Sequence, residues 1–398
     1  MSPHVFLVAG EESGDRLGGA LIAAIKRRAP GARFSGVGGL HMTIEGVQSL
    51  FALGDLAIIG FSAVPASLPK ILRRIRETAD AVIAALPDVL VIIDSPEFTH
   101  RVARRVRAIA PKIPIVDYVC PSVWAWRPGR ASAMRSYVDH VLALLPFEPA
   151  AMRKLGGPRC TFVGHPLSEH FSDLRPNAEE ARRRLSDPPV LLVMPGSRAA
   201  EIQRMAGTFG MAAALVSDRI GGLEAVVPMV PRLADMVREA VKWWQVPTRV
   251  VTSPDEKGAA FRIARAALTK SGTSTLELAV AGVPMVAGYK VSPVEELIAR
   301  LMIKVPSMIL ANLVLGEKVV PELLQRACTP AELAKILQPL MSDTPERLHQ
   351  VEAFARLDSI MEIGKAVPSD RAAAVALDCA AGLNQPERET VASAPPTA

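Results

Sequence analysis

Short apolar runs of strand length alternate along the chain with longer stretches in which apolar residues recur every three or four positions. In the first half these runs begin at residues 4, 89, 114 and 140, and in the second half at residues 190, 223, 248, 266 and 284. Strands that alternate with helices form a parallel sheet with helices on both faces. The pattern therefore predicts an α/β protein with two doubly wound, Rossmann-like domains.

The alternation pauses once, between Gly164 and Pro189, in a stretch rich in polar residues and proline. We place the domain boundary there. The predicted parts are residues 1–170, residues 171–350, helices in 351–383 that pack back on the first domain, and a disordered tail at 384–398. A ligand of an open parallel sheet lies beyond the carboxyl ends of the strands. We therefore expect the two domains to face one another across a cleft lined by residues that follow strands.

Composition and charge change this picture little. Hydrophobic residues make up 49% and charged residues 22% of 398 residues, which is enough material for two cores. The four cysteines are far apart and form no C-x-x-C pair, so we expect neither a zinc site nor a disulfide framework. The first residues lack the basic and long apolar regions of a signal peptide, which favours the cytoplasm. The net charge of +6 permits an anionic partner without identifying one.

One candidate site follows the predicted strands of the second domain. Ser271, Gly272 and Thr273 form a turn of small and hydroxyl residues before a helix, and Glu277 follows one helical turn later. Such a turn can bind a diphosphate while the glutamate accepts hydrogen bonds from a ribose. The same residues would equally form an N-cap with its capping box. Arg198 follows the strand that begins at 190. This position favours a contact with a phosphate, and the alternative is a surface arginine beside a helix N-cap.

A second candidate site follows the strands of the first domain. Asp94 ends the apolar run at 89 and could act as a general base, although the pattern alone favours a helix N-cap before Pro96. Trp124 and Trp126 suit a sugar or a base, but tryptophan pairs more often serve packing. The turn after the first strand carries three carboxylates, including Glu11, where a phosphate-binding loop avoids fixed negative charge.

The segment from Leu56 to Glu77 joins an uncharged stretch, too short and proline-broken to span a bilayer, to a group of cations. It is typical of an element that lies in a membrane interface, and also of an amphipathic core helix. The membrane contacts would be Ile58, Ile59, Phe61, Lys70, Arg73, Arg74 and Arg76. The sequence lacks the glycine-rich fingerprint of dehydrogenases, the P-loop, the zinc-protease motif and the nucleophile elbow, so those classes lose their main support.

Nine segments resemble, in order and spacing, the lipid-A-disaccharide synthase family, and the resemblance extends from about residue 4 to residue 380. They are AGEESGD (9–15), GVGGLHMTIEGV (36–47), VIIDSPEF (91–98), YVCPSVWAWR (118–127), LLPFE (144–148), FVGHPL (162–167), MPGSR (194–198), SGTSTLE (271–277) and PELLQ (321–325). The tryptophan-rich and SGT-to-Glu segments are the most specific. The sequence departs from the family pattern at Glu12, Cys120 and Ala311, where alanine, serine and proline are common.

The resemblance implies an inverting glycosyltransferase of the GT-B fold, bound peripherally to the inner face of the cytoplasmic membrane. Such an enzyme transfers 2,3-diacylglucosamine from its UDP derivative to 2,3-diacylglucosamine 1-phosphate (lipid X). The product is a β-1,6-linked disaccharide 1-phosphate, and UDP is released. The first domain would then bind the acceptor and face the membrane, and the second would bind the UDP-sugar. The resemblance implies no cofactor, metal or nucleic acid, and it allows a homodimer.

Residue by residue, the resemblance assigns Asp94 as the general base that takes the proton of the acceptor 6-hydroxyl. The UDP-sugar contacts would be Arg198, Ser271, Gly272, Thr273, Glu277, Asn312 and Gln325. With the nucleotide in the second domain, the acidic turn is free to use Glu11, Ser13 and Asp15 for acceptor hydroxyls or to support Asp94. We expect basic residues near the membrane-facing segment to hold the acceptor phosphate. The rival interpretations are another GT-B enzyme, such as a UDP-N-acetylglucosamine transferase or epimerase, and a two-lobed binding protein without chemistry.

Overall fold

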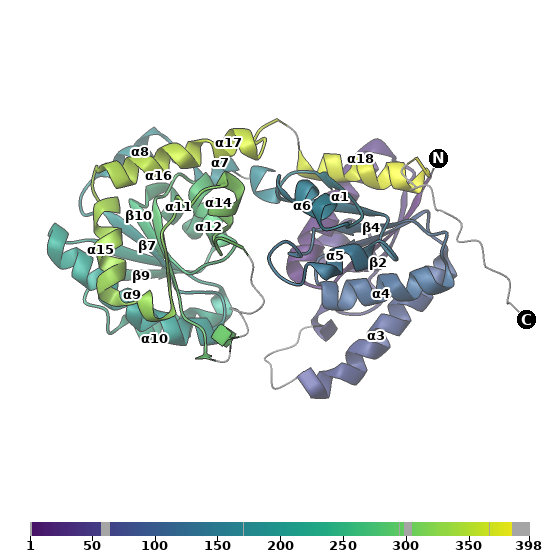
Figure 1. Ribbon diagram of the computed structural model, residues 1–398, viewed down its shortest axis with the longest axis horizontal. Helices are drawn as coiled ribbons and strands as arrows, with labels where there is room; N and C mark the ends of the chain where they lie inside the picture. Colours follow the sequence, from purple (N-terminus) through teal and green to yellow (C-terminus); the bar gives the residue numbers. More distant parts are fainter. Residues whose placement is uncertain are drawn as a thin grey trace, which may run out of the picture. The chain divides into compact units, whose positions relative to one another are not determined.

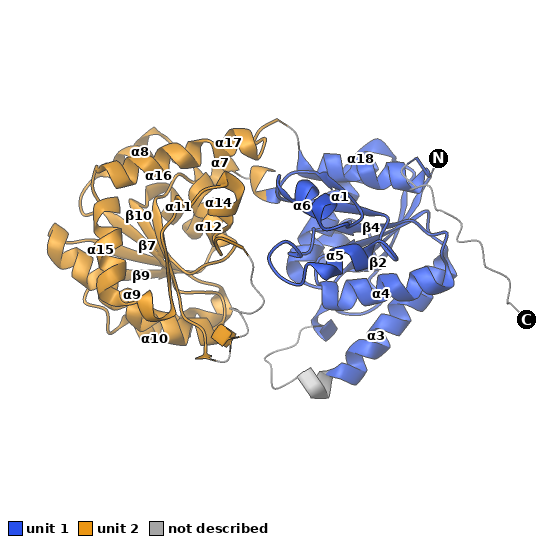
Figure 2. Ribbon diagram, viewed as in Figure 1, with its two compact units in different colours: residues 1–166, 366–398 blue, residues 167–365 orange. Residues whose placement is uncertain are grey.

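The computed structural model describes residues 2–56, 64–169, 171–293, 295–297, 305–365 and 367–383. The chain forms two compact units, residues 1–166 with 366–398 and residues 167–365 (Figure 2). Helix α18 (Pro368–Ala380) packs on α1 (Glu12–Arg28) within unit 1 (Figure 1). Residues 351–365 differ from the prediction because they belong to unit 2, where Phe354 and Leu357 are buried. The predicted tail at 384–398 lies outside the described residues.

The sheet of unit 1 has six parallel strands in the order β2-β1-β3-β4-β5-β6. The strands are β1 (His4–Ala9), β2 (Arg33–Val37), β3 (Val89–Ile93), β4 (Ile115–Tyr118), β5 (His140–Ala143) and β6 (Arg159–Phe162). After β2 at one edge the chain returns past β1 to β3, so the strand order reverses between β1 and β3. Ala9 pairs with Ile93, and the turns after these two strands therefore leave the sheet side by side. A crevice at such a reversal is where open parallel sheets bind ligands.

The sheet of unit 2 also has six parallel strands, in the order β12-β11-β10-β7-β8-β9. The strands are β7 (Val190–Met194), β8 (Glu224–Pro228), β9 (Thr248–Val251), β10 (Ala266–Thr269), β11 (Met285–Tyr289) and β12 (Glu322–Leu324). Here the order reverses between β7 and β10, and Met194 pairs with Thr269. Both sequence-predicted sites thus follow the strands at which their sheets reverse order.

Helices cover both faces of each sheet (Figure 1). In unit 1 these are α1, α2 (Leu40–Ile44), α3 (Val64–Ala85), α4 (Pro96–Ile109), α5 (Gly129–Met134), α6 (Glu148–Lys154) and α18, with the short η1 (Leu53–Leu56). In unit 2 they are α7 (Phe171–Leu174), α8 (Ala178–Leu185), α9 (Ala199–Ile220), α10 (Ala234–Val241), α11 (Pro254–Ile263), α12 (Ser274–Val280), α14 (Leu310–Leu315), α15 (Pro330–Leu340), α16 (Pro345–Ala355) and α17 (Leu357–Ile360). The short 3-10 turns are η3 (Pro166–Glu169), η4 (Pro231–Leu233) and η5 (Gln325–Ala327).

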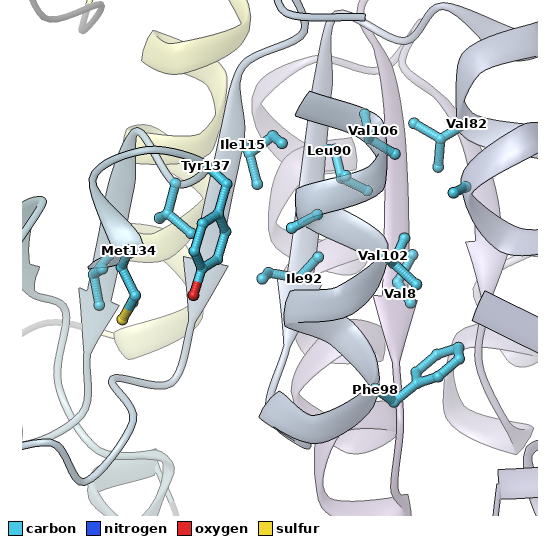
Figure 3. Packing of buried hydrophobic residues seen from close by; sticks show 14 of the residues in the cluster. Val8, Val82, Leu90, Ile92, Phe98, Val102, Val106, Ile115, Met134 and Tyr137 are labelled. Atoms are coloured by element: carbon cyan, nitrogen blue, oxygen red, sulfur yellow. The ribbon is translucent and has the colours of Figure 1, made fainter. Parts of the chain in front are cut away.

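Strand β3 is apolar throughout because both of its faces are buried. Leu90 and Ile92 belong to the core cluster on the side of α3 and α4 (Figure 3). Val89, Val91 and Ile93 belong to the cluster on the other face, which α1 and α18 cover. Side chains that alternate between two covered faces leave no polar position in the strand. Asp94, the first polar residue after β3, therefore stands at the end of a rigid, buried element.

Of the predicted membrane segment, Leu56 and α3 are described, whereas Ile58, Ile59 and Phe61 lie outside the described residues. The later part of α3 packs against α4 and buries residues at helical spacing in the core, namely Ile75, Ala79 and Val82. The core-helix alternative therefore describes this part of α3. Within the described residues, no helix combines the length and apolarity that crossing a bilayer requires.

The cations of this segment divide into two groups. Lys70 Nζ donates to Asp55 Oδ1 at 2.7 Å, and Arg74 donates to Asp55 Oδ2 and to a Glu77 carboxylate oxygen. Hydrogen bonds from both cations hold the pKa of Asp55 below its usual value. Arg73 and Arg76 are exposed and take part in no ion pair among the described residues. Two of the four predicted cations are thus already neutralised within the protein.

Candidate functional site

The crevice of unit 1 is built around Asp94, which follows β3. Asp94 and Ser95 both have left-handed backbone angles, with φ of 54° and 50°. Such angles cost on the order of 1–3 kcal/mol in residues other than glycine and persist where surrounding contacts hold them. The Asp94 carboxylate accepts hydrogen bonds from Ser95 N at 2.8 Å and from Ser13 Oγ at 3.0 Å. The N-cap residue of α4 is Ser95. Asp94 is therefore not the N-cap of this helix, which was the alternative to a general base.

The acidic turn after β1 has two different uses. Glu11 Oε1 accepts a hydrogen bond from Ser95 Oγ at 3.1 Å, so Glu11, like Ser13, lies against the Asp94 turn. Asp15 is 1% exposed. Its carboxylate accepts three backbone N–H groups at the start of α2, from Gly39, His41 and Met42. Asp15 was predicted to contact the acceptor or to support Asp94. Its carboxylate instead bonds the backbone at the start of α2, and these hydrogen bonds connect α2 to α1.

A cavity of about 150 Å³ lies beside Asp94. Its wall includes His100, Asp117, Trp126 and Arg130, together with residues 119–123, which follow β4. His100 Nε2 lies 3.1 Å from Asp117 Oδ2, and Asp117 is 1% exposed. Burial raises the pKa of Asp117, the negative charge of Asp94 acts in the same direction, and His100 opposes both. This histidine–aspartate pair was not predicted, although an aspartate inside an apolar strand was a visible signal.

The two tryptophans also have different uses. Trp124 packs edge to face on Phe147, with ring centroids 5.0 Å apart, and its Nε1 donates to Glu148 Oε1 at 3.1 Å. Trp126 lines the cavity beside Asp94, is 38% exposed, and carries the Arg127 guanidinium 4.7 Å from its ring centroid. Trp124 therefore serves packing, whereas Trp126 is one of the residues that line the cavity.

Glu148 leads to a prediction about stability. Its buried carboxylate accepts hydrogen bonds from Leu144 N and Leu145 N as well as from Trp124. Burial raises the pKa of Glu148 from its ordinary 4.5 to about 7. The folded state keeps a proton that the unfolded state loses between these values. The free energy of unfolding therefore falls as the pH rises from 4.5 to 7, by on the order of 3 kcal/mol through this group.

Urea unfolding at pH 5 and pH 8, followed by tryptophan fluorescence, measures this loss. In Glu148→Gln the loss between the two pH values should be smaller than in the wild type by about 3 kcal/mol. The new amide has a single acceptor oxygen and leaves one of the N–H donors without a partner, but that cost does not depend on pH. Equal pH dependence in the two proteins would contradict the raised pKa.

The crevice of unit 2 contains two cations around one buried carboxylate. Glu201 of α9 accepts hydrogen bonds from Ser197 N at 3.0 Å and from Lys270 Nζ at 2.9 Å. Arg198 Nη1 lies 3.5 Å from Glu201 Oε1, and the Arg198 side chain is 79% exposed. Burial acts to raise the pKa of Glu201, but Lys270, Ser197 and Arg198 outweigh it and hold the pKa below its usual value. Lys270, which directly follows β10, was not predicted.

The turn after Lys270 does not form the capping box that was the alternative to a ligand site. Thr273 occupies the N-cap position of α12 without a capping hydrogen bond from its side chain. Glu277 Oε2 instead accepts from Lys257 Nζ at 2.9 Å. Ser271 is buried and donates to the Met308 carbonyl at 2.9 Å. The Gly272 carbonyl accepts hydrogen bonds from Thr275 N and Thr275 Oγ1. Within the described part of the chain, the backbone N–H groups of Gly272 and Thr273 and the Thr273 hydroxyl therefore remain open to a ligand.

Two predicted nucleotide contacts are occupied inside unit 2. Asn312 is 3% exposed, and its amide uses both donors and both acceptor positions. The partners are Val319 N and Val320 N for its oxygen, and Ser307 Oγ and Val320 O for its nitrogen. Gln325 accepts from Val291 N and donates to Glu296 Oε2. In this structure both side chains organise loops, which a sequence motif cannot distinguish from a ligand contact.

Comparison with known proteins gives a consistent result. A family model described as lipid-A-disaccharide synthetase matches residues 5–374. The lipid-A-disaccharide synthase of Nitrobacter winogradskyi is 58% identical over 378 residues, covering 95% of this chain and 96% of its own. That of Bradyrhizobium diazoefficiens is 57% identical over 374 residues, covering 94% and 95%. The crystal structure of Acinetobacter baumannii MurG has a TM-score of 0.58 at 14% identity and covers 94% of this chain and 99% of its own. The predicted GT-B fold is confirmed.

Proposed function

The chain belongs to the lipid-A-disaccharide synthase family, and from this premise we propose how its residues carry out the reaction of that family. The protein is an inverting glycosyltransferase of lipid A biosynthesis. It condenses UDP-2,3-diacylglucosamine with lipid X, forming the β-1,6-linked disaccharide 1-phosphate and UDP. The roles of individual residues and the association with a membrane are the content of the proposal.

Asp94 is the general base in this proposal. It takes the proton of the acceptor 6-hydroxyl while that oxygen attacks the anomeric carbon of the donor. One observation carries the proposal. The Asp94 carboxylate is held by hydrogen bonds from Ser13 and Ser95, beside a cavity at the point where the strand order of unit 1 reverses. A carboxylate has about four lone-pair positions, and two donors reach Asp94 among the described residues. Room for a substrate hydroxyl therefore remains.

Arg198 and Lys270 stabilise the leaving UDP in this proposal. Departure of a diphosphate builds negative charge, which preorganised cations stabilise more in the transition state than in the ground state. The Arg198 guanidinium is exposed and can form paired hydrogen bonds with phosphate oxygens. A Cβ at Gly272 would meet only Lys270 Nζ, at 3.9 Å, so the backbone of this turn is open to a phosphate. Thr273 and Glu277 would contact the ribose side.

The last part of the proposal concerns the membrane. The start of α3 contacts the inner face of the cytoplasmic membrane peripherally. Leu68 and Leu72 lie one helical turn apart and are 44% and 39% exposed. Arg73 and Arg76 are exposed beside them. Apolar side chains next to free cations suit a surface of anionic lipid, from which acylated substrates would be taken.

Release of UDP by the purified protein tests the reaction. UDP-2,3-diacylglucosamine is supplied in mixed micelles containing EDTA, with and without lipid X. We expect UDP release that requires lipid X, together with a disaccharide 1-phosphate detected by mass spectrometry. Release without lipid X would indicate a hydrolase. An isomeric UDP-sugar formed without net release would indicate an epimerase, whereas folded protein that binds the donor and neither changes it nor releases UDP would favour a binding protein.

A further inference from the structure

Helix α4 carries a row of polar side chains, the polar stripe, that has no role in the proposed reaction. Glu97, His100, Arg101 and Arg104 follow one another at spacings of three, one and three residues, which places them on one face of the helix. The opposite face, including Val102, is buried in the core. The stripe forms part of the wall of a second cavity, of about 170 Å³, whose other lining residues include Arg130, Met134 and Tyr137. We call this the arginine cavity.

The arginine cavity has an excess of positive charge. Three arginines and one glutamate line it. Glu97 pairs with Arg130 and lies 3.6 Å from Arg101 Nη2, and the hydrogen bond from Arg130 is the main reason that its pKa is low. Arg104 makes no ion pair within the described residues. Its guanidinium lies 4.6 Å from the centroid of Tyr137, and its Nη2 donates to the Tyr137 hydroxyl at 3.1 Å.

The ligand of such a cavity is expected to be a compact dianion. One glutamate balances one of the three arginines, which leaves two positive charges that face an accessible hollow. A phosphate monoester carries close to two negative charges at neutral pH and matches the planar donor pattern of guanidinium groups. The hydroxyl of Tyr137 adds a polar group to the same wall.

The arginine cavity adjoins the cavity that contains Asp94. Both are lined by Pro96, His100, Pro121 and Arg130, so these residues separate two neighbouring hollows of unit 1. In the acceptor sugar, the carbon that carries the 6-hydroxymethyl group and the carbon that carries the 1-phosphate are both bonded to the ring oxygen, so the two groups are separated by less than the width of one sugar ring. A molecule with its hydroxyl at Asp94 can therefore direct its phosphate toward the arginines.

We propose that the arginine cavity binds the 1-phosphate of lipid X while Asp94 receives the 6-hydroxyl, an inference that rests on the proposed function. The phosphate then sets the orientation of the acceptor. This differs from the expectation that the cations of α3 hold the phosphate. Lys70 and Arg74 of that segment are already bonded to Asp55, whereas Arg104 is exposed and has no carboxylate partner in the described chain.

Arg104→Gln tests the site with two acceptors, lipid X and the same diacylglucosamine without its phosphate. With lipid X, kcat/KM should fall about tenfold to a hundredfold, mainly through KM, because charge-assisted bonds to the phosphate are lost. With the phosphate-free acceptor, variant and wild type should agree within about twofold, since no phosphate is present to bind. Arg105→Gln is the matched control, because Arg105 lies on the same helix but pairs with Asp80.

Three results would overturn the site. Arg104→Gln could lower the rate equally with both acceptors, which would show a structural role. It could leave the rate with lipid X unchanged. It could weaken the binding of UDP, which would assign the arginines to the donor diphosphate.

A binding measurement separates this inference from the reaction. Calorimetric titration of lipid X in neutral micelles, without donor, should show binding that both the removal of the phosphate and Arg104→Gln weaken. If this holds while no UDP is ever released, the reaction is wrong and the phosphate site stands. If UDP release requires lipid X but Arg104→Gln binds it normally, the reaction stands and the site is wrong.

Discussion

Asp94→Asn should lower kcat by about a hundredfold to ten-thousandfold, the range that a positioned general base contributes. The amide cannot take the proton of the acceptor hydroxyl. It keeps the shape of the side chain, tolerates a φ of 54°, and can still bond Ser95 N and Ser13 Oγ. We therefore expect an unchanged thermal unfolding midpoint and near-normal binding of both substrates. Steady-state release of UDP at saturating donor and lipid X measures the effect.

Ser13→Ala provides a graded comparison for this variant. It removes the hydroxyl that orients Asp94 but leaves the base in place, so its kcat should fall only about tenfold. If Asp94→Asn kept full kcat with normal substrate binding, the base would have to be another group. Asp117 with His100, in the same cavity, would be the next candidate.

Arg198→Ala should lower kcat by about a hundredfold to a thousandfold, the loss found when one group that stabilises transition-state charge is removed. The side chain is 79% exposed, so the variant should fold normally. Arg198→Lys should recover part of the rate, because lysine supplies the charge without the paired donors of a guanidinium. Steady-state kcat and the affinity for UDP are the measurements.

Arg219→Ala is the matched control for Arg198→Ala. Arg219 lies in the last turn of the same helix and donates to Gln338 at the surface, so its loss should leave the rate unchanged. Wild-type kcat in Arg198→Ala would contradict the assigned role. Lys270, bonded to the same Glu201, would then be the cation to replace.

The central strands were predictable from the sequence because a parallel strand covered on both faces must be apolar throughout. Three edge strands, β2, β6 and β12, were not predicted, since each is partly exposed and carries polar residues. The same reasoning led to the predicted roles of Asp94 and Arg198, and the structure places both residues after central strands at the reversal points of their sheets.

The sequence did not show which partner each polar side chain binds. Motif spacing placed Asp15 and Asn312 near ligands, but their hydrogen bonds go to other groups of the protein, most of them backbone groups, that only the folded chain brings to them. A carboxylate or an amide has the same sequence signal whether it binds a substrate or the N–H groups of a neighbouring loop. The tertiary structure also brought Ser13 to Asp94 through the register of β1 and β3.

The sequence by itself determined the fold class, the family and the two strand ends that carry the proposed chemistry, because these depend on local patterns of burial and on motif order. Only the tertiary structure decided the pair of His100 and Asp117, the pair of Glu201 and Lys270, and the arginine cavity. These groups join residues from separate elements. Their energies depend on distance and burial in the folded chain, and no local spacing encodes either quantity.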